Sequence, residues 1–185
     1  EIRDSETAGL AVNTALTGPV PSKKKEQALA LTYAFDAGLL GSSVTAKSVT
    51  TSPMDFSPYG SIRFFAYGDN KGETLFFRSG SATDFFEFSI PVGWTGWKPI
   101  TIVQHKDSTQ RAVGWAQSEQ AEGTVRQQGN PNLVTVGQLT IGILNNSNAA
   151  NTGQVWINTF FASDVVARIG YAARLQSGFD YLGWG

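Results

Sequence analysis

Few residues in this chain have the types and spacing that catalysis needs. The single histidine, His105, lies in the polar run QHKDST, where an exposed side chain is expected, and no G-x-S-x-G motif provides a nucleophile. Hydrolysis of a glycosidic bond requires two carboxylates that face each other. Asp84 and Glu87 are close in sequence, but residues three apart on a strand point to opposite faces. The sequence therefore favours a protein that is not an enzyme.

A second group of side chains is suited to binding. Arg63, Arg78 and Glu87 fall on strand faces opposite apolar rows, and charged groups are rarely part of a core unless they are paired. Arg78 and Glu87 could form a cross-strand ion pair on a solvated face. Tyr67 and Trp156 provide rings that either contact a ligand or belong to the core. If their strands are neighbours, all five side chains could share one face.

The composition excludes several classes of partner. The chain has 14 basic and 15 acidic residues, so its net charge is −1. This balance gives no electrostatic reason to expect nucleic acid or an anionic membrane surface, and neutral partners are expected. The absence of cysteine excludes disulfides and thiolate metal sites. No run of 18 apolar residues occurs, so no transmembrane helix is expected.

Strict alternation of apolar and polar residues predicts an all-β fold, an antiparallel β-sandwich of about eight strands without a helix. The 20 glycines and 12 phenylalanines fit many turns and an aromatic core. The segment from Asp55 to Ile102 is expected to hold four consecutive strands, whereas residues 123–132, GTVRQQGNPN, are expected to be a loop. The expected strands cover residues 29–35, 43–51, 61–67, 74–78, 84–92, 98–104, 138–144 and 154–162.

The same patterns divide the chain into three segments. Residues 1–25 are expected to be a polar N-terminal arm or linker, and residues 26–164 to form the sandwich. Residues 165–185 are expected to be a C-terminal extension or the start of a following domain. Because the chain starts at Glu1 without Met or an apolar leader, we expect a mature or excised fragment.

Several motifs follow one another in a recognisable order. They are DFSPYGSIRFFAYGD, a hairpin that ends FFEFSIPV, then GWTGWKPITI, LTIGIL and GQVWINTFF, which together cover about Leu29 to Ser163. This order resembles the galactose-binding-like jelly roll of carbohydrate-binding modules, especially those similar to family 11. The last motif, extended to GQVWINTFFASDV, is also similar to the end of a sandwich domain of the bacterial cell-surface protein SprA and its relatives.

The resemblance implies a noncatalytic carbohydrate-binding module of a secreted or cell-surface bacterial protein. A neutral polysaccharide or oligosaccharide would lie across one sheet, with its C–H faces on aromatic rings and its hydroxyls bonded to guanidinium and carboxylate groups. The implied ligand-binding residues are Arg63, Tyr67, Arg78, Glu87 and Trp156. The alternative is a structural or protein-interaction domain that contacts other parts of a larger surface or outer-membrane assembly. The excess of 12 Phe over 5 Tyr favours this alternative.

A structural calcium ion is the one cofactor that the resemblance suggests. In such modules the last strand often ends in an Asp that helps to hold calcium, but this position is Asn158 here, which weakens the expected site. Asp69, Asn70 and Glu73 in GDNKGE supply oxygen atoms without the D-x-D-x-D-G order. A solvated hairpin turn is therefore expected at GDNKGE, and no cofactor is expected elsewhere.

Overall fold

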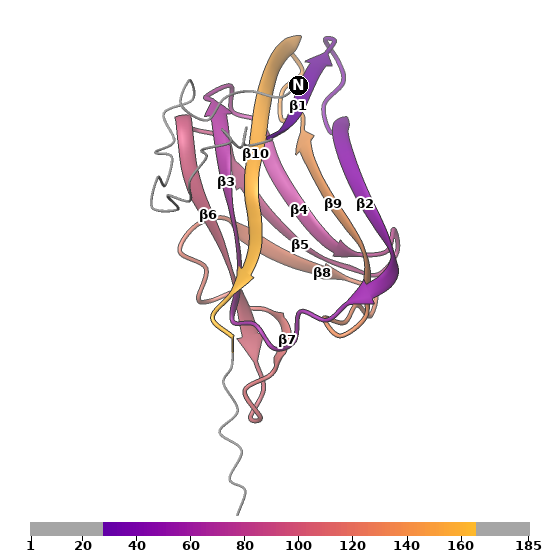
Figure 1. The fold of residues 1–185 in the computed structure, drawn as a ribbon. Coiled ribbons are helices and arrows are strands. Elements are labelled where there is room, and N and C mark those ends of the chain that lie inside the picture. Colours follow the sequence, from indigo (N-terminus) through magenta and orange to yellow (C-terminus); the bar gives the residue numbers. More distant parts are fainter. Residues whose placement is uncertain (1–27, 166–185) are drawn as a thin grey trace, which may run out of the picture.

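A computed structural model describes residues 28–165, which form two antiparallel sheets of five strands packed face to face (Figure 1). The predicted β-sandwich is therefore confirmed, and no helix occurs among the described residues. The predicted N-terminal arm, residues 1–25, lies outside the described residues, as does all of the predicted C-terminal segment except Val165.

Each sheet combines strands that are distant in sequence. The first sheet has the order β1 (Leu29–Phe35), β10 (Asn151–Ser163), β3 (Ser61–Asp69), β6 (Thr95–Lys106) and β7 (Ala112–Trp115). The second sheet has the order β2 (Ser43–Met54), β9 (Val136–Leu144), β4 (Thr74–Gly80), β5 (Phe85–Pro91) and β8 (Thr124–Gln128). The nested pairs β1–β10, β2–β9, β3–β6 and β4–β5 give the connectivity of a jelly roll.

Alternating side chains from both sheets fill the space between them. In β3 the inward positions are Ile62, Phe64 and Ala66, all at most 1% exposed. The core also contains aromatic contacts between the sheets, because Phe77 of β4 stacks on Trp115 of β7 with ring centroids 5.6 Å apart. Such rings bury large apolar areas, so they dominate the stability of the sandwich. The period-two pattern in the sequence thus predicted the inward face of β3 correctly. In β10, however, a register shift between Asn158 and Phe161 reverses the faces, so that Phe160 rather than Phe161 contacts the core rings of Phe64 and Phe77.

Two features of the strand pattern differ from the prediction. The described residues contain ten strands, because β7 and β8 add to the predicted eight, and β8 falls inside the segment 123–132 that was expected to be a loop. Polar residues fill β8, TVRQQ, since its outer edge and one face are open to solvent. The segment from Asp55 to Ile102 also serves both sheets, since β3 pairs with β6 in the first and β4 with β5 in the second.

The prediction of a solvated turn at GDNKGE is wrong for one residue. Asn70 and Gly72 do adopt positive φ values of 55° and 85° and are exposed, as a tight turn requires. Glu73, however, is only 2% exposed and accepts a hydrogen bond of 2.9 Å from the hydroxyl of Tyr33. Oδ2 of Asp69, 3.2 Å from the same hydroxyl oxygen, is the alternative acceptor for its single proton. Burial and these carboxylates raise the pKa of Tyr33 above its ordinary value, so the phenol stays protonated as a donor.

Candidate functional site

The structure divides the five predicted ligand-binding side chains between two opposite surfaces. Arg63 and Tyr67 of β3 and Trp156 of β10 lie on the outer face of the first sheet. Arg78 of β4 and Glu87 of β5 lie on the outer face of the second sheet. The prediction that all five share one face is wrong because their strands belong to different sheets. Alternation along a strand assigns a side chain to a face but not to a sheet.

On the first sheet the aromatic side chains pack against one another. Trp156, Tyr67 and Trp97 occupy directly paired positions on β10, β3 and β6. The rings of Tyr67 and Trp156 are stacked with centroids 4.6 Å apart, and Trp97 meets Tyr67 edge-on at 5.6 Å. All three are half-buried. Farther along β3, the guanidinium of Arg63 forms an ion pair of 3.1 Å with Asp164.

A row of polar and charged side chains crosses all five strands of the second sheet. Its members are paired directly from strand to strand, which puts them on one face. In order they are Lys47 of β2, Thr140 of β9, Arg78 of β4, Glu87 of β5 and Arg126 of β8. We call these five residues the charged row. Three cations and one carboxylate give it a formal charge of 3 − 1 = +2.

Glu87 is the centre of the charged row. It is 6% exposed, and its two carboxylate oxygens accept hydrogen bonds from Nε of Arg78 and Nε of Arg126. Burial raises the pKa of Glu87, but the hydrogen bonds and charges of Arg126 and Arg78 outweigh this effect and hold the pKa below its usual value. The predicted ion pair between Arg78 and Glu87 is confirmed, but Glu87 is buried and not solvated as expected. Arg126 was missed because its polar strand was expected to be a loop.

Two buried aromatic rings pack against the guanidinium groups of Arg78 and Arg126. Cζ of Arg78 lies 4.7 Å from the ring centroid of Phe76 and 4.6 Å from that of Phe85, while Cζ of Arg126 lies 5.3 Å from that of Phe85. These distances suit cation–π contacts. Both rings are buried, at 3% and 2% exposure. Phe76 also packs closely over Gly142, where an added Cβ would lie 2.5 Å from its ring.

The terminal nitrogens of the two arginines remain available. Both guanidinium groups bond to Glu87 through Nε, and within the described residues their Nη groups donate no hydrogen bond. The side chain of Arg78 is 32% exposed and that of Arg126 is 56% exposed. The charged row therefore presents fixed, partly exposed N–H donors to solvent on the outer face of the second sheet.

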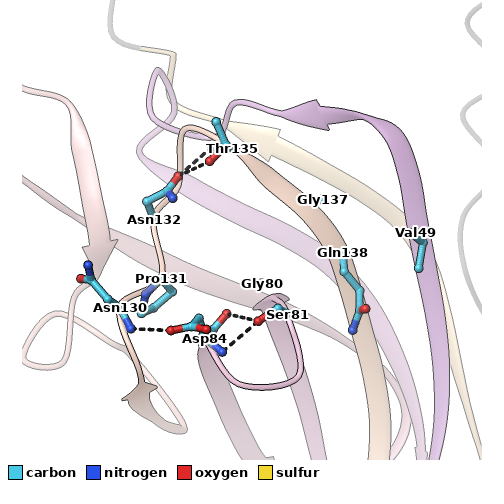
Figure 2. Close-up of a pocket in the computed structure, with 10 residues that line it drawn as sticks. All are labelled: Val49, Gly80, Ser81, Asp84, Asn130, Pro131, Asn132, Thr135, Gly137 and Gln138. Atoms are coloured by element: carbon cyan, nitrogen blue, oxygen red, sulfur yellow. Dashed lines mark hydrogen bonds between the residues drawn. The ribbon is translucent and has the colours of Figure 1, made fainter.

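A pocket of about 350 Å³ lies next to the charged row. Figure 2 shows the residues that line it. Its floor includes Gln138 of β9 and Val49 of β2, which pair with each other two positions along from Thr140 and Lys47. Two positions correspond to ~7 Å along a strand, so the pocket and the row form one continuous surface. The pocket walls come from the end of β4 and the β4–β5 turn, through Gly80, Ser81 and Asp84, and from the β8–β9 connection, through Asn130, Pro131, Asn132 and Thr135. Gly137 of β9 also lines the pocket.

Hydrogen bonds hold these walls in place. Oδ1 of Asp84 accepts from the backbone N–H of Asn130 at 2.9 Å, which ties the two loops together (Figure 2). This bond is the main reason that the pKa of Asp84 lies below its ordinary value. Oδ1 of Asn132 likewise accepts from the backbone N–H of Thr135 at 2.8 Å. Within the described residues, the side-chain amide of Asn130 and Oε1 of Gln138 make no hydrogen bond, so they are free to meet a ligand.

Features that would indicate catalysis or a bound metal are sparse in the described part of the chain. His105 is exposed near the end of β6, as predicted. No group of three or more His, Cys, Asp or Glu side chains could hold a metal ion among residues 28–165. The calcium site suggested by the sequence stays a prediction. Asn158, the residue at the position of the expected Asp, is 8% exposed and pairs with Phe65 of β3. None of the described segments is a helix long and apolar enough to cross a membrane.

Comparison with known proteins gives only weak structural likeness. No protein-family model matches the sequence, and no curated protein matches it. A solved structure described as "Structure of PfGH50B" is similar with a TM-score of 0.49 and 9% sequence identity, over 77% of this chain. The chain spans only 23% of that protein's length. A likeness at this level says nothing about ligand or activity.

Proposed function

We propose that this chain is a noncatalytic carbohydrate-binding module that holds a glycan along the outer face of the second sheet. The observation that carries the proposal is the continuous surface made by the charged row and the neighbouring pocket. Sugar hydroxyls both donate and accept hydrogen bonds, and this surface offers guanidinium N–H donors beside the free amide oxygen of Gln138. Small numbers of fixed polar groups beside a pocket are typical of ligand sites.

The charge states of the two carboxyl groups support binding rather than hydrolysis. A glycosidase needs a general acid whose pKa is raised, so that the acid is protonated at the working pH. In this surface the pKa values of Glu87 and Asp84 are both lowered by hydrogen bonds. Each group is therefore an anion near pH 7, and each already holds structure together. A retaining or inverting pair of carboxyl groups is not supported by this arrangement.

The arrangement also supports modest affinity. The rings of Phe76 and Phe85 lie beneath the guanidinium groups, so they offer no open platform on which a sugar face could stack. Binding would then depend on hydrogen bonds and on apolar contact with Val49, which is 74% exposed. We expect a Kd on the order of 0.1 to 1 mM, corresponding to about −4 to −5.5 kcal/mol.

Isothermal titration of the full chain against a panel of soluble polysaccharides tests the proposal. We expect at least one glycan to bind, and Gln138→Ala to weaken that binding about threefold or more, because it removes a hydrogen-bond partner. The matched control is Arg63→Ala, which changes an arginine on the opposite face. Binding that fails in Arg63→Ala but survives in Gln138→Ala would move the site to the first sheet. A folded chain that binds no glycan would refute the proposal.

A structural or protein-interaction domain is the second candidate, and the first sheet favours it. The rings of Trp156, Tyr67 and Trp97 are packed against one another rather than around an open groove. Such a packed row is suited to contact with protein. If this candidate is correct, the titration panel is negative while circular dichroism shows an intact β-fold. For either candidate function, we propose from the sequence resemblance that the chain is part of a secreted or cell-surface bacterial protein.

A further inference from the structure

The charged row has a local charge that the whole chain does not reveal. The sequence has a net charge of −1, and for that reason a neutral partner was expected. Within the charged row, however, Lys47, Arg78 and Arg126 are opposed by Glu87 alone. Electrostatic attraction of a ligand follows the local potential of the face that it approaches. The outer face of the second sheet is therefore suited to a ligand with negative charge.

Glu87 differs from the other ion-paired carboxylates in the number of arginines that it meets. Among the described residues, the other ion pairs within 4.0 Å join Asp164 to Arg63, Glu122 to Lys98 and Asp55 to Arg111. Glu87 instead meets two arginines. One of them would neutralise its charge, so the second leaves an excess positive charge on a partly exposed surface. An anion from outside the chain can pair with this excess positive charge.

The geometry of the two arginines suits an oxyanion. Each guanidinium bonds to Glu87 through Nε and rests on a buried ring, which leaves its Nη donors at the surface. Sulfate and carboxylate groups accept paired N–H bonds from such planar donors. Because Glu87, Phe76 and Phe85 already fix the guanidinium groups, little side-chain entropy is lost when an anion binds.

The pocket next to the row has a different electrostatic character. It contains Asp84, whose lowered pKa keeps its carboxyl group ionised near pH 7. A negative group is repelled there, whereas hydroxyls can bond to the free amide of Asn130. An anionic substituent is thus directed to the charged row, and uncharged parts of the same sugar chain are directed to the pocket.

We propose that Arg78 and Arg126 bind an anionic substituent, a sulfate ester or a uronate-type carboxylate, of the glycan held on the outer face of the second sheet. This inference rests on the proposed carbohydrate-binding function and specifies its ligand class. Lys47, exposed at the β2 end of the row, adds long-range attraction. The recognised chemistry is a negatively charged oxyanion on a polyhydroxyl chain.

Three polymers with one backbone test the inference on the full chain: dextran, carboxymethyl-dextran and dextran sulfate. We expect one of the charged polymers to bind about tenfold tighter than dextran at low salt. The preference should shrink as salt screens the partly exposed arginines. The polymer with the higher affinity distinguishes carboxylate from sulfate as the preferred group. Equal binding of charged and neutral dextran would overturn the inference and leave the proposed function intact.

Substitutions connect the preference to the two arginines. Arg126→Gln removes an arginine whose side chain is 56% exposed, so the fold should survive, and we expect it to abolish most of the tenfold preference. Arg78→Gln should do the same, and Arg63→Gln on the opposite face is the matched control that should retain the preference. A preference that persists in both Arg126→Gln and Arg78→Gln would overturn the assignment.

A fourth probe, poly-L-glutamate, distinguishes a glycan from an acidic peptide. We expect it to bind more weakly than the preferred charged dextran, since it lacks the hydroxyls that the pocket would bond. If poly-L-glutamate binds as tightly and depends equally on Arg126, the face recognises acidic protein instead and the inference is wrong. If no polysaccharide binds at all, the proposed function fails together with the inference.

Discussion

Replacing Glu87 by Gln should destabilise the sandwich, because this change removes the only carboxylate in the charged row while keeping the shape of the side chain. Two charge-assisted hydrogen bonds would be weakened, each worth about 1.5 to 3 kcal/mol when fully shielded from water. The side chains of Arg78 and Arg126 are 32% and 56% exposed, so water partly replaces the lost partner. We therefore expect a loss of about 2 to 3 kcal/mol in the free energy of unfolding, below the full sum of the two bonds.

Urea denaturation at pH 7 measures this loss through the shift in midpoint at constant slope. A melting experiment should show a decrease of roughly 5 to 10 °C for a domain of this size. The control is Asp164→Asn, which breaks the exposed pair with Arg63 and should cost ~0 to 1 kcal/mol. A loss in Glu87→Gln no larger than that of the control would refute the reasoning that Glu87 organises the row.

The same pair of proteins gives a pH dependence with a definite sign. The pKa of Glu87 is lower in the folded state than its ordinary value of 4.5. Its contribution to stability is therefore complete above that ordinary value and is lost as the pH falls through the lower, folded-state pKa. The difference between the wild type and Glu87→Gln should be constant from pH 6 to 7 and should shrink below about pH 4.5. A difference that does not change between pH 7 and pH 3 would contradict the assigned pKa direction.

Two further predictions concern close packing and a buried hydrogen bond. Gly142→Ala should cost about 1 to 3 kcal/mol in urea denaturation, because its Cβ would lie 2.5 Å from the ring of Phe76. Gly137→Ala, where nothing lies within 4 Å, is the control, and equal effects of the two changes would contradict the packing argument. Tyr33→Phe should cost about 1 to 3 kcal/mol, since Glu73 loses its 2.9 Å donor in a buried site. An unchanged urea midpoint for Tyr33→Phe would show that this hydrogen bond adds no stability.

The strands were largely predictable, but the sheets were not. Period-two alternation marks a strand and its inward residues locally, as in Ile62, Phe64 and Ala66 of β3. Membership of a sheet depends instead on pairing between distant segments, such as β3 with β10 and β4 with β9. The sequence neighbours β3 and β4 are in different sheets, so Arg63 and Arg78 face away from each other. Nothing in the spacing of those two residues distinguishes this outcome from a shared face.

The candidate site was predictable only in part, for reasons that concern particular residues. Arg78 and Glu87 were identified because charges opposite apolar rows must be paired or exposed. Arg126 follows the alternation T-V-R-Q-Q between Gly123 and Gly129, but a single apolar residue, Val125, is too weak a signal for a strand. The strand that contains Arg126 is defined by its pairing with β5, which its own short sequence does not indicate.

The site combines the jelly-roll framework with an added segment, as the connectivity shows. The pairs β1–β10, β2–β9, β3–β6 and β4–β5 form the jelly roll without any residue from the segment between β6 and β9. That segment contains β8, which contributes Arg126, and the connection from Asn130 to Thr135, which forms one wall of the pocket. The framework supplies Arg78 and Glu87, whose ion pair serves stability. The proposed recognition of a charged glycan depends on the second arginine and on the pocket wall. Both come from a segment that takes no part in the four nested strand pairs of the jelly roll.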